Sequence, residues 1–209
     1  MKARIIAVVV ALLVGPVLFA GQPFANEQKL PKAEVNDSGL HVQPWFRDTF
    51  LDLREDIAEA KAEGKQLAIM WEQKGCPYCR EMHDVNLRIP EVVDYIKEHF
   101  FVVQLNLWGD REVTDIDGEK TTEKKLGRKY RVQFTPTIQF FPADALAGGK
   151  VSGRDLEVWR LLGYWKPFHF KHTFQYVHEK GFETEPNFQR WLQGVAEEYQ
   201  AQGKEVNLW

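Results

Sequence analysis

Cys76 and Cys79 are the only cysteines in the 209 residues, so any thiol chemistry must take place at this pair. Two residues separate them, which lets the two sulfurs close a small disulfide ring. An apolar, strand-like run precedes the pair and a helical run follows it. Because a helix N-terminus stabilises a thiolate, we expect a lowered pKa at Cys76. Pro77 fits this placement, since proline suits the first turn of a helix.

A structural role for the pair is the competing interpretation. A disulfide between Cys76 and Cys79 closes a loop too short to stabilise a fold much, and the chain has no other cysteines for a second bridge. A short, local and isolated disulfide is better suited to exchange. The sequence therefore favours redox chemistry over covalent reinforcement.

A metal site is the second alternative. His83 follows Cys79 by four residues, which places both on one face of a helix. Cys76, Cys79 and His83 could then hold a soft metal such as copper or zinc, although no fourth ligand is evident. Further along, the fragment from Asp115 to Gly118 resembles part of a calcium loop, but it lacks the remaining ligand positions, so we expect a surface hairpin or loop there.

Composition and charge set the outer bounds. The chain is 44% hydrophobic and 13% aromatic, which is enough for one good-sized core, and one main domain is expected. The formal net charge is −3 and no basic stripe is present, which argues against a nucleic-acid partner.

The N-terminal segment has the pattern of an export signal. Lys2 and Arg4 precede an uncharged apolar run over residues 5–18, and small residues follow at Ala20 and Ala25. The run is short for a membrane-spanning helix, although an uncleaved anchor stays open. We expect a signal peptide over 1–25, a polar linker over 26–44, the main domain over 45–182 and a C-terminal helical extension over 183–209.

Hydrophobic periodicity and turn residues predict the elements that must position the pair. Helices are expected over 46–64, 76–87, 90–99, 122–130, 167–180 and 186–202. Strands are expected over 66–71, 101–107, 137–141 and 157–162, with a glycine turn at Gly148 and Gly149. Trp71, Trp159 and Trp191 are expected in the core.

Two motifs together resemble the thioredoxin superfamily: Gly75-Cys76-Pro77-Tyr78-Cys79 and, later in the chain, Phe134-Thr135-Pro136-Thr137. The resemblance covers about residues 46–180. It implies the α/β thioredoxin-like fold, a central mixed β-sheet flanked by helices, here with an extra C-terminal helix. The block from Glu72 to Cys79, followed by Met82-His83, looks like the periplasmic thioredoxins that accompany bacterial sulfur-oxidation (Sox) systems.

The resemblance also implies roles. Cys76 would be the exposed nucleophile and Cys79 would resolve the mixed disulfide. Pro136 would follow a cis peptide bond and face the pair, although a trans proline opening a strand is the ordinary alternative. The residues implied to contact substrate are Pro77, Tyr78, Thr135, Pro136, Gly163 and Tyr164, with the backbone of Thr135 pairing with substrate in β fashion.

One departure concerns proton transfer. Thioredoxins have a buried aspartate and a nearby lysine at places that here hold Met70 and Gln104. Losing both charges together avoids an unpaired buried ion. Glu72, at the end of the strand before the motif, is the available proton acceptor, with a solvated strand-end glutamate as the alternative.

The sequence therefore predicts an exported, periplasmic thiol–disulfide oxidoreductase that reduces protein disulfides, with the Cys76–Cys79 disulfide as its redox group and no further cofactor. A membrane thiol transporter would supply electrons, and a Sox carrier protein would be a substrate. The alternative is a metal-binding or copper-chaperone-like module that uses Cys76, Cys79 and His83.

Overall fold

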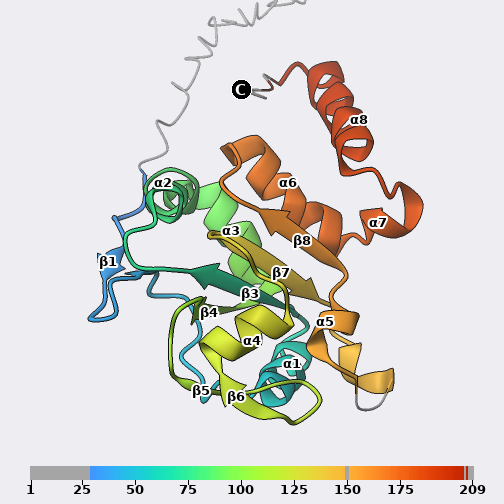
Figure 1. Ribbon diagram of the computed structural model, residues 1–209. Coiled ribbons are helices and arrows are strands. Elements are labelled where there is room, and N and C mark those ends of the chain that lie inside the picture. The colour runs from blue at the N-terminus through green and yellow to red at the C-terminus, as the bar shows by residue number, and fades with distance from the viewer. Residues whose placement is uncertain (1–28, 149–150, 205, 207–209) are drawn as a thin grey trace, which may run out of the picture.

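The fold is built on one four-stranded sheet, seen edge-on in the middle of the computed structural model, which describes residues 29–148, 151–204 and 206 (Figure 1). Its strands are β3 (Gln66–Glu72), β4 (Phe100–Asn106), β7 (Thr137–Phe141) and β8 (Trp159–Leu162). Their order is β4-β3-β7-β8, with β3 and β4 parallel and the other two pairs antiparallel. The expected mixed central sheet is confirmed.

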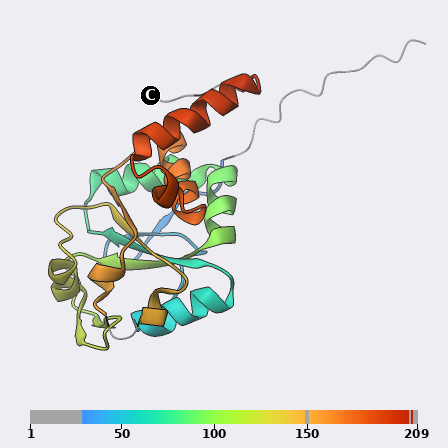
Figure 2. The same cartoon turned by 90° about the vertical axis from the view of Figure 1, so that its right-hand side faces the viewer.

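Both faces of the sheet are covered, which explains why its central strands are apolar throughout. On one face lie α1 (Leu53–Ala62) and α4 (Glu123–Lys129), packed with side chains such as Trp71 and Tyr130. The opposite face is covered by α2 (Pro77–Asp84), α3 (Pro90–His99) and α6 (Pro167–His178), packed around Phe140 and Phe174. Figures 1 and 2 show these layers from two directions. The thioredoxin-like architecture expected from the motifs is present.

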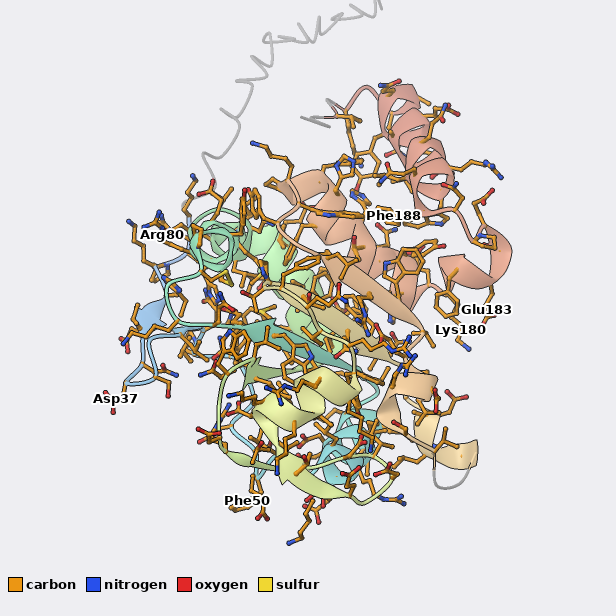
Figure 3. The ribbon with its side chains drawn as sticks, viewed as in Figure 1. Asp37, Phe50, Arg80, Lys180, Glu183 and Phe188 are labelled. Atoms are coloured by element: carbon orange, nitrogen blue, oxygen red, sulfur yellow. A yellow bond between two sulfur atoms is a disulfide. The ribbon has the colours of Figure 1, made fainter. Side chains whose placement is uncertain are left out.

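The C-terminal helices add a layer outside α6. A short helix, α7 (Gly181–Thr184), leads into α8 (Phe188–Ala201). Tyr176 of α6 packs with Phe188 and Leu192 of α8 in a cluster separate from the two main cores. Figure 3 shows Phe188 on the side of α8 that faces the domain. Trp159 and Trp191 border this cluster and are half-buried, whereas Trp71 is fully buried.

The start of α1 differs from the prediction. Periodicity places Phe46 and Phe50 on the helix, but α1 begins at Leu53. Asp52 caps it by accepting hydrogen bonds from the N–H groups of Arg54 and Glu55, and Leu51 just before has a positive φ of 58°. Phe50 is 97% exposed and points away from the domain (Figure 3). The cap, rather than the apolar spacing, sets the boundary.

Several other boundaries shift by a few residues. The redox helix ends at Asp84 and is followed by a 3-10 turn, η1 (Asn86–Arg88). The last strand begins at Trp159 because the residues before it form a short helix, α5 (Gly153–Leu156), which the sequence does not predict. A second 3-10 turn, η2 (Ala145–Gly148), precedes the predicted glycine turn, of which Gly149 lies outside the described residues.

Part of the predicted linker, 26–44, packs on the domain over the residues that the structure describes. It contains a small hairpin of β1 (Glu34–Val35) and β2 (His41–Val42). Leu40 is buried, and the backbone carbonyl of His41 accepts a hydrogen bond from the Gln104 amide at 2.7 Å. The residues of the predicted signal peptide, 1–25, lie outside the described part, and within that part no helix is long and apolar enough to span a bilayer.

Of the hairpin or loop expected around Asp115 to Gly118, the structure has the hairpin, formed by β5 (Glu112–Thr114) and β6 (Lys120–Thr122). The carboxylates of Asp115, Asp117 and Glu119 converge there and are the one group of three potential metal ligands among the described residues. The Lys129 ammonium contacts all three, at 2.5, 2.8 and 2.6 Å. A side-chain cation therefore stands where the calcium-loop resemblance would place an ion.

Asp56 of α1 leads to a prediction about stability and pH. Its side chain is buried, and burial raises the pKa of its carboxyl to about 7, against an opposing hydrogen bond from Thr49. The folded state holds this proton more tightly than the unfolded chain, so the stability it lends is present at acid pH and is lost as pH rises toward and through 7. We expect Asp56→Asn to stabilise the protein by on the order of 2 to 4 kcal/mol at pH 8 and far less at pH 4.

Urea unfolding of wild type and variant at both pH values measures this difference. Lys61→Gln removes a charge from an exposed position of the same helix and should change stability by less than about 0.5 kcal/mol at either pH. An Asp56→Asn gain of equal size at pH 4 and pH 8 would contradict the assigned protonation.

Candidate functional site

Cys76 and Cys79 form a disulfide at the start of α2, with an S–S distance of 2.16 Å and Cα atoms 5.3 Å apart. Cys76 is the N-cap residue, and its Sγ accepts a hydrogen bond from the Cys79 N–H at 3.0 Å. Pro77 occupies the first turn, as predicted. Cys76 keeps 5% of its surface and Cys79 none, so Cys76 is the more accessible sulfur, although less exposed than expected.

The chain reaches this position directly from the centre of the sheet. β3 ends at Glu72, and a short turn leads to α2. Gly75 lies in this turn and has a φ of 73°, a backbone conformation that favours glycine. The disulfide thus lies beyond the carboxyl end of a central strand, where the helix N-terminus directs its free N–H groups at the first cysteine.

The second motif meets the disulfide from the neighbouring strand. The Thr135–Pro136 bond is cis, which confirms that expectation. The carbonyl oxygen of Thr135 lies 3.5 Å from Cys76 Sγ, and the Pro136 carbonyl accepts a hydrogen bond from the Gly163 N–H at 2.9 Å. Two of the residues expected to contact substrate therefore lie beside the cysteine pair, and a third, Gly163, is tied to them.

Of the remaining residues of that group, Tyr78 lies in the first turn of α2 and Tyr164 follows β8. Tyr78 is 61% exposed. Tyr164 is half-buried, and burial together with the nearby Glu81 carboxylate raises the pKa of its phenol. The structure places both residues along the segments that carry the cysteine pair and Gly163, while their contact with substrate stays a prediction.

Three exposed apolar side chains near the disulfide are not among the predicted site residues. Trp108, just after β4, donates its indole N–H to the Gln73 side chain at 2.8 Å, three residues before Cys76. Phe134 directly precedes Thr135, and Leu162 pairs with Thr137 in the sheet. With Tyr78 they form an apolar rim of four side chains, each at least 46% exposed. Their position in the sequence could have indicated them, because Trp108 directly follows a predicted strand and Leu162 ends another.

Glu72 is fully buried, so the interpretation of a solvated strand-end glutamate is wrong. Its Oε1 lies 2.8 Å from Nε2 of His83, which is also fully buried. Nδ1 of His83 lies 3.0 Å from the side-chain nitrogen of Gln43, in the N-terminal segment. Three hydrogen-bonded side chains therefore link the N-terminal segment, α2 and the end of β3, and the sequence predicts neither Gln43 nor the pairing of His83.

His83 is unsuited to the metal set proposed with Cys76 and Cys79. Both of its ring nitrogens already have hydrogen-bond partners, and His41 stacks on its ring with centroids 5.4 Å apart. A metal ligand must offer a free nitrogen lone pair to the ion. The cysteine pair would therefore have to bind a metal without this histidine.

Met70 and Gln104 are direct neighbours in the ladder between β3 and β4. The two positions that hold an aspartate and a lysine in thioredoxins are therefore neighbours here. Because both carry uncharged residues, neither position leaves an unpaired buried ion. Glu72 lies two residues beyond Met70 and on the same face of β3. The buried carboxylate of this site is displaced along the strand toward the disulfide.

Comparison with known proteins agrees with this geometry. Residues 53–178 match the model of the thioredoxin-like domain family. No curated protein matches the chain. A thioredoxin-fold protein from Helicobacter pylori is 18% identical with a TM-score of 0.53, covering 73% of this chain and 98% of that one.

Two further solved structures are more distant in shape. A thioredoxin from Thermus thermophilus is 26% identical, with a TM-score of 0.48, over 64% of this chain and 90% of its own. The C-terminal domain of DsbD from Neisseria meningitidis, in its reduced form, is 19% identical, with a TM-score of 0.41, over 59% and 91%. The family match spans more than half of the chain and includes the disulfide. The chain therefore belongs to the thioredoxin-like domain family and is a thiol–disulfide oxidoreductase.

Proposed function

We propose that this oxidoreductase is exported and reduces disulfides in other proteins of the cell envelope. The observation that supports it most is the disulfide at the N-terminus of α2, with Cys76 beside the carbonyl of Thr135, the residue that follows Phe134 of the apolar rim. A thiolate formed at Cys76 would be stabilised there by the helix N-terminus and by the Cys79 N–H.

The reaction proceeds by two exchanges. The Cys76 thiolate attacks one sulfur of the substrate disulfide, forms a mixed disulfide and releases the other substrate sulfur as a thiolate. The Cys79 thiolate then attacks Cys76 Sγ, which breaks the bond to the substrate. Two electrons pass from the cysteine pair to the substrate, which leaves as a dithiol after taking up protons, and a thiol donor must reduce the pair again.

The apolar rim supports a polypeptide substrate. Tyr78, Trp108, Phe134 and Leu162 expose large apolar side chains around the disulfide, and such clusters mark interaction sites. Thr135 precedes β7, so its backbone lies outside the strand ladder and can pair with an extended segment. Pro77, Tyr78, Pro136, Gly163 and Tyr164 would complete the contact surface.

The finer assignments rest on the sequence. The charged and apolar pattern of residues 1–25 supports export to a periplasm. The block around the cysteine pair, which resembles thioredoxins of sulfur-oxidation systems, supports a reductant that receives electrons from a membrane thiol transporter and serves a Sox carrier protein. Glu72 is the proposed proton acceptor.

Copper or zinc carriage is the second candidate function. It is disfavoured by His83, which is buried and has a hydrogen-bond partner at each ring nitrogen. Metal content of the protein purified with its thiols reduced separates the two functions. About one equivalent of tightly held metal that protects both thiols from alkylation would favour the metal module.

The in-cell redox state tests the proposed direction. Cells are quenched in acid, free thiols are alkylated, and the forms of the protein are separated by mass. A reductant supplied by a membrane donor should be found largely as the dithiol and in the soluble envelope fraction. A Cys76→Ser, Cys79→Ser double variant marks the position of the species without thiols. A fully oxidised pool would instead assign the protein to disulfide formation.

A further inference from the structure

Gln43 lies outside the family domain, which begins at residue 53, yet it contacts the side chains beneath the disulfide. We infer that Gln43 is a positioning residue for proton transfer at Cys79 and acts through His83 and Glu72. The inference deepens the proposed function and rests on it. It also implies that the N-terminal segment is part of the redox machinery.

The hydrogen bonds define the protonation of the chain. An amide nitrogen can only donate, so Gln43 requires Nδ1 of His83 to be an acceptor. A neutral imidazole then carries its proton on Nε2, which donates to Glu72 Oε1 at 2.8 Å. Gln43 thereby selects the histidine tautomer that supports the Glu72 carboxylate. This support matters because a buried carboxylate without donors takes up a proton readily.

Glu72 has one oxygen to spare. Its Oε2 is buried and has no hydrogen-bond partner among the described residues. Cys79 precedes His83 by one helical turn, and both are fully buried on the face of α2 that covers the sheet. Glu72 reaches that same face through His83. A proton that leaves Cys79 therefore has an unpartnered carboxylate oxygen to receive it, directly or through a buried water.

The step balances as follows. In the mixed disulfide, the Cys79 thiol transfers its proton to Glu72 Oε2 and the resulting thiolate attacks Cys76 Sγ. The Cys76–substrate bond breaks, and the electron pair leaves with the substrate thiolate. The proton on Glu72 returns to solvent afterwards. His83 and Gln43 change no bond; they hold the acceptor.

Three other titratable or charged side chains lie near this chain of hydrogen bonds, on β2 and α2. His41 of β2 stacks on His83, and burial together with His83 lowers the pKa of His41. Arg80 and Asp84 of α2 lie near His41, with opposite effects on its charge. From the sheet, Asn106 of β4 lies opposite Glu72 and is uncharged. None of these groups donates to Glu72, so the donor that Gln43 sets in place is the one to test.

Stopped-flow mixing of the reduced protein with excess 5,5′-dithiobis(2-nitrobenzoate) separates the two sulfurs. Attack by Cys76 releases a first coloured thiolate, and resolution by Cys79 releases a second, so the slower phase reports deprotonation of Cys79. Gln43→Met keeps the size of the side chain but removes the donor. We expect its second phase to be at least about fivefold slower at pH 7, with its pH midpoint moved upward by about one unit.

Gln43→Glu should move the pH midpoint of the second phase downward, opposite to the shift expected for Gln43→Met. A carboxylate beside Nδ1 favours a proton there, so His83 becomes an imidazolium that keeps its bond to Glu72 and adds a positive charge. The first phase should stay within twofold of wild type in both variants. Arg88→Met is the matched control, since it removes another hydrogen bond to the N-terminal segment, at the Leu30 carbonyl, and it should leave the second-phase pH midpoint unchanged.

Thermal unfolding confirms that each variant is folded. The second-phase pH midpoint should shift in opposite directions in Gln43→Met and Gln43→Glu, which a mere packing defect would not produce. An unchanged second-phase midpoint in both Gln43 variants, with two normal phases in the wild type, would overturn the inference and leave the oxidoreductase standing. A wild type that releases no second thiolate and does not reduce insulin would instead overturn the proposed function.

Discussion

Replacing Cys76 by serine is expected to abolish reduction of protein disulfides, leaving only the rate of the chemical reductant. Cys76 is the N-cap of α2 and the more accessible of the two sulfurs, whereas Cys79 has no exposed surface. A hydroxyl at this position cannot attack a disulfide at neutral pH. The loss should be several orders of magnitude, measured as the turbidity of insulin reduced by dithiothreitol in the presence of the variant.

Cys79→Ser should also lose turnover, but by a different route. Cys76 can still attack, and the mixed disulfide then lacks its resolving thiol. The variant should accumulate as a covalent complex with substrate. Tyr78→Phe serves as the matched control because it keeps the ring in the apolar rim and leaves both sulfurs in place, and we expect turnover within a few-fold of wild type. A Cys76→Ser variant that accumulates the same covalent complex, or a Cys79→Ser variant that accumulates none, would contradict the assigned roles.

Replacing Glu123 by alanine is expected to lower the stability of the fold by roughly 1–3 kcal/mol. The side chain is 1% exposed, and its carboxylate joins the start of the 106–111 segment to its end. Oε1 accepts hydrogen bonds from the Asn106 N–H at 2.8 Å and the Arg111 guanidinium at 2.7 Å, and Oε2 accepts from the Arg111 N–H at 3.4 Å. Its removal leaves the part-buried N–H of Asn106 without this acceptor and frees the exposed Arg111 side chain from the segment.

The same change should affect the site, because this segment carries Trp108 of the apolar rim. Urea unfolding measures the stability. Because the chain has seven tryptophans, the part of the fluorescence that Trp108→Phe removes reports the segment in the folded variant. Glu112→Ala is the control, since its side chain is 71% exposed and its pairing with Lys120 is long, at 3.5 Å. We expect it to change stability by less than about 0.5 kcal/mol. A Glu123→Ala loss that small would show that the carboxylate does not hold the segment.

The parts of the fold that sequence could predict are those with a strong local pattern. The apolar runs of β3 and β4, the proline at the start of α2 and the Thr135–Pro136 motif each carry their own signal. The boundary of α1 had two conflicting signals. Phe46 and Phe50 fit a helical period, but Asp52 followed by Glu55 is a capping pattern, and the backbone hydrogen bonds it satisfies decided the outcome.

The site was predictable where residues are neighbours in sequence and obscure where they meet through the fold. Nothing in the sequence links Gln43 to His83, which is 40 positions away, because their contact depends on the path of the N-terminal segment across α2. The burial of Glu72 likewise depends on a partner from another element. A glutamate at a strand end is expected to be solvated unless its buried partner is known, which is why the sequence predicts Glu72 as a candidate proton acceptor but does not predict its buried environment.

The asymmetry of the two sulfurs is the central claim, and an intact-mass measurement tests it most directly. Reduced Cys79→Ser and Cys76→Ser proteins are each incubated with the same peptide containing an intramolecular disulfide, quenched in acid and weighed. The buried position of Cys79 and the helix N-terminus at Cys76 predict a peptide adduct on the Cys79→Ser protein and almost none on the Cys76→Ser protein. Adducts of equal yield, or an adduct on the Cys76→Ser protein alone, would contradict the account.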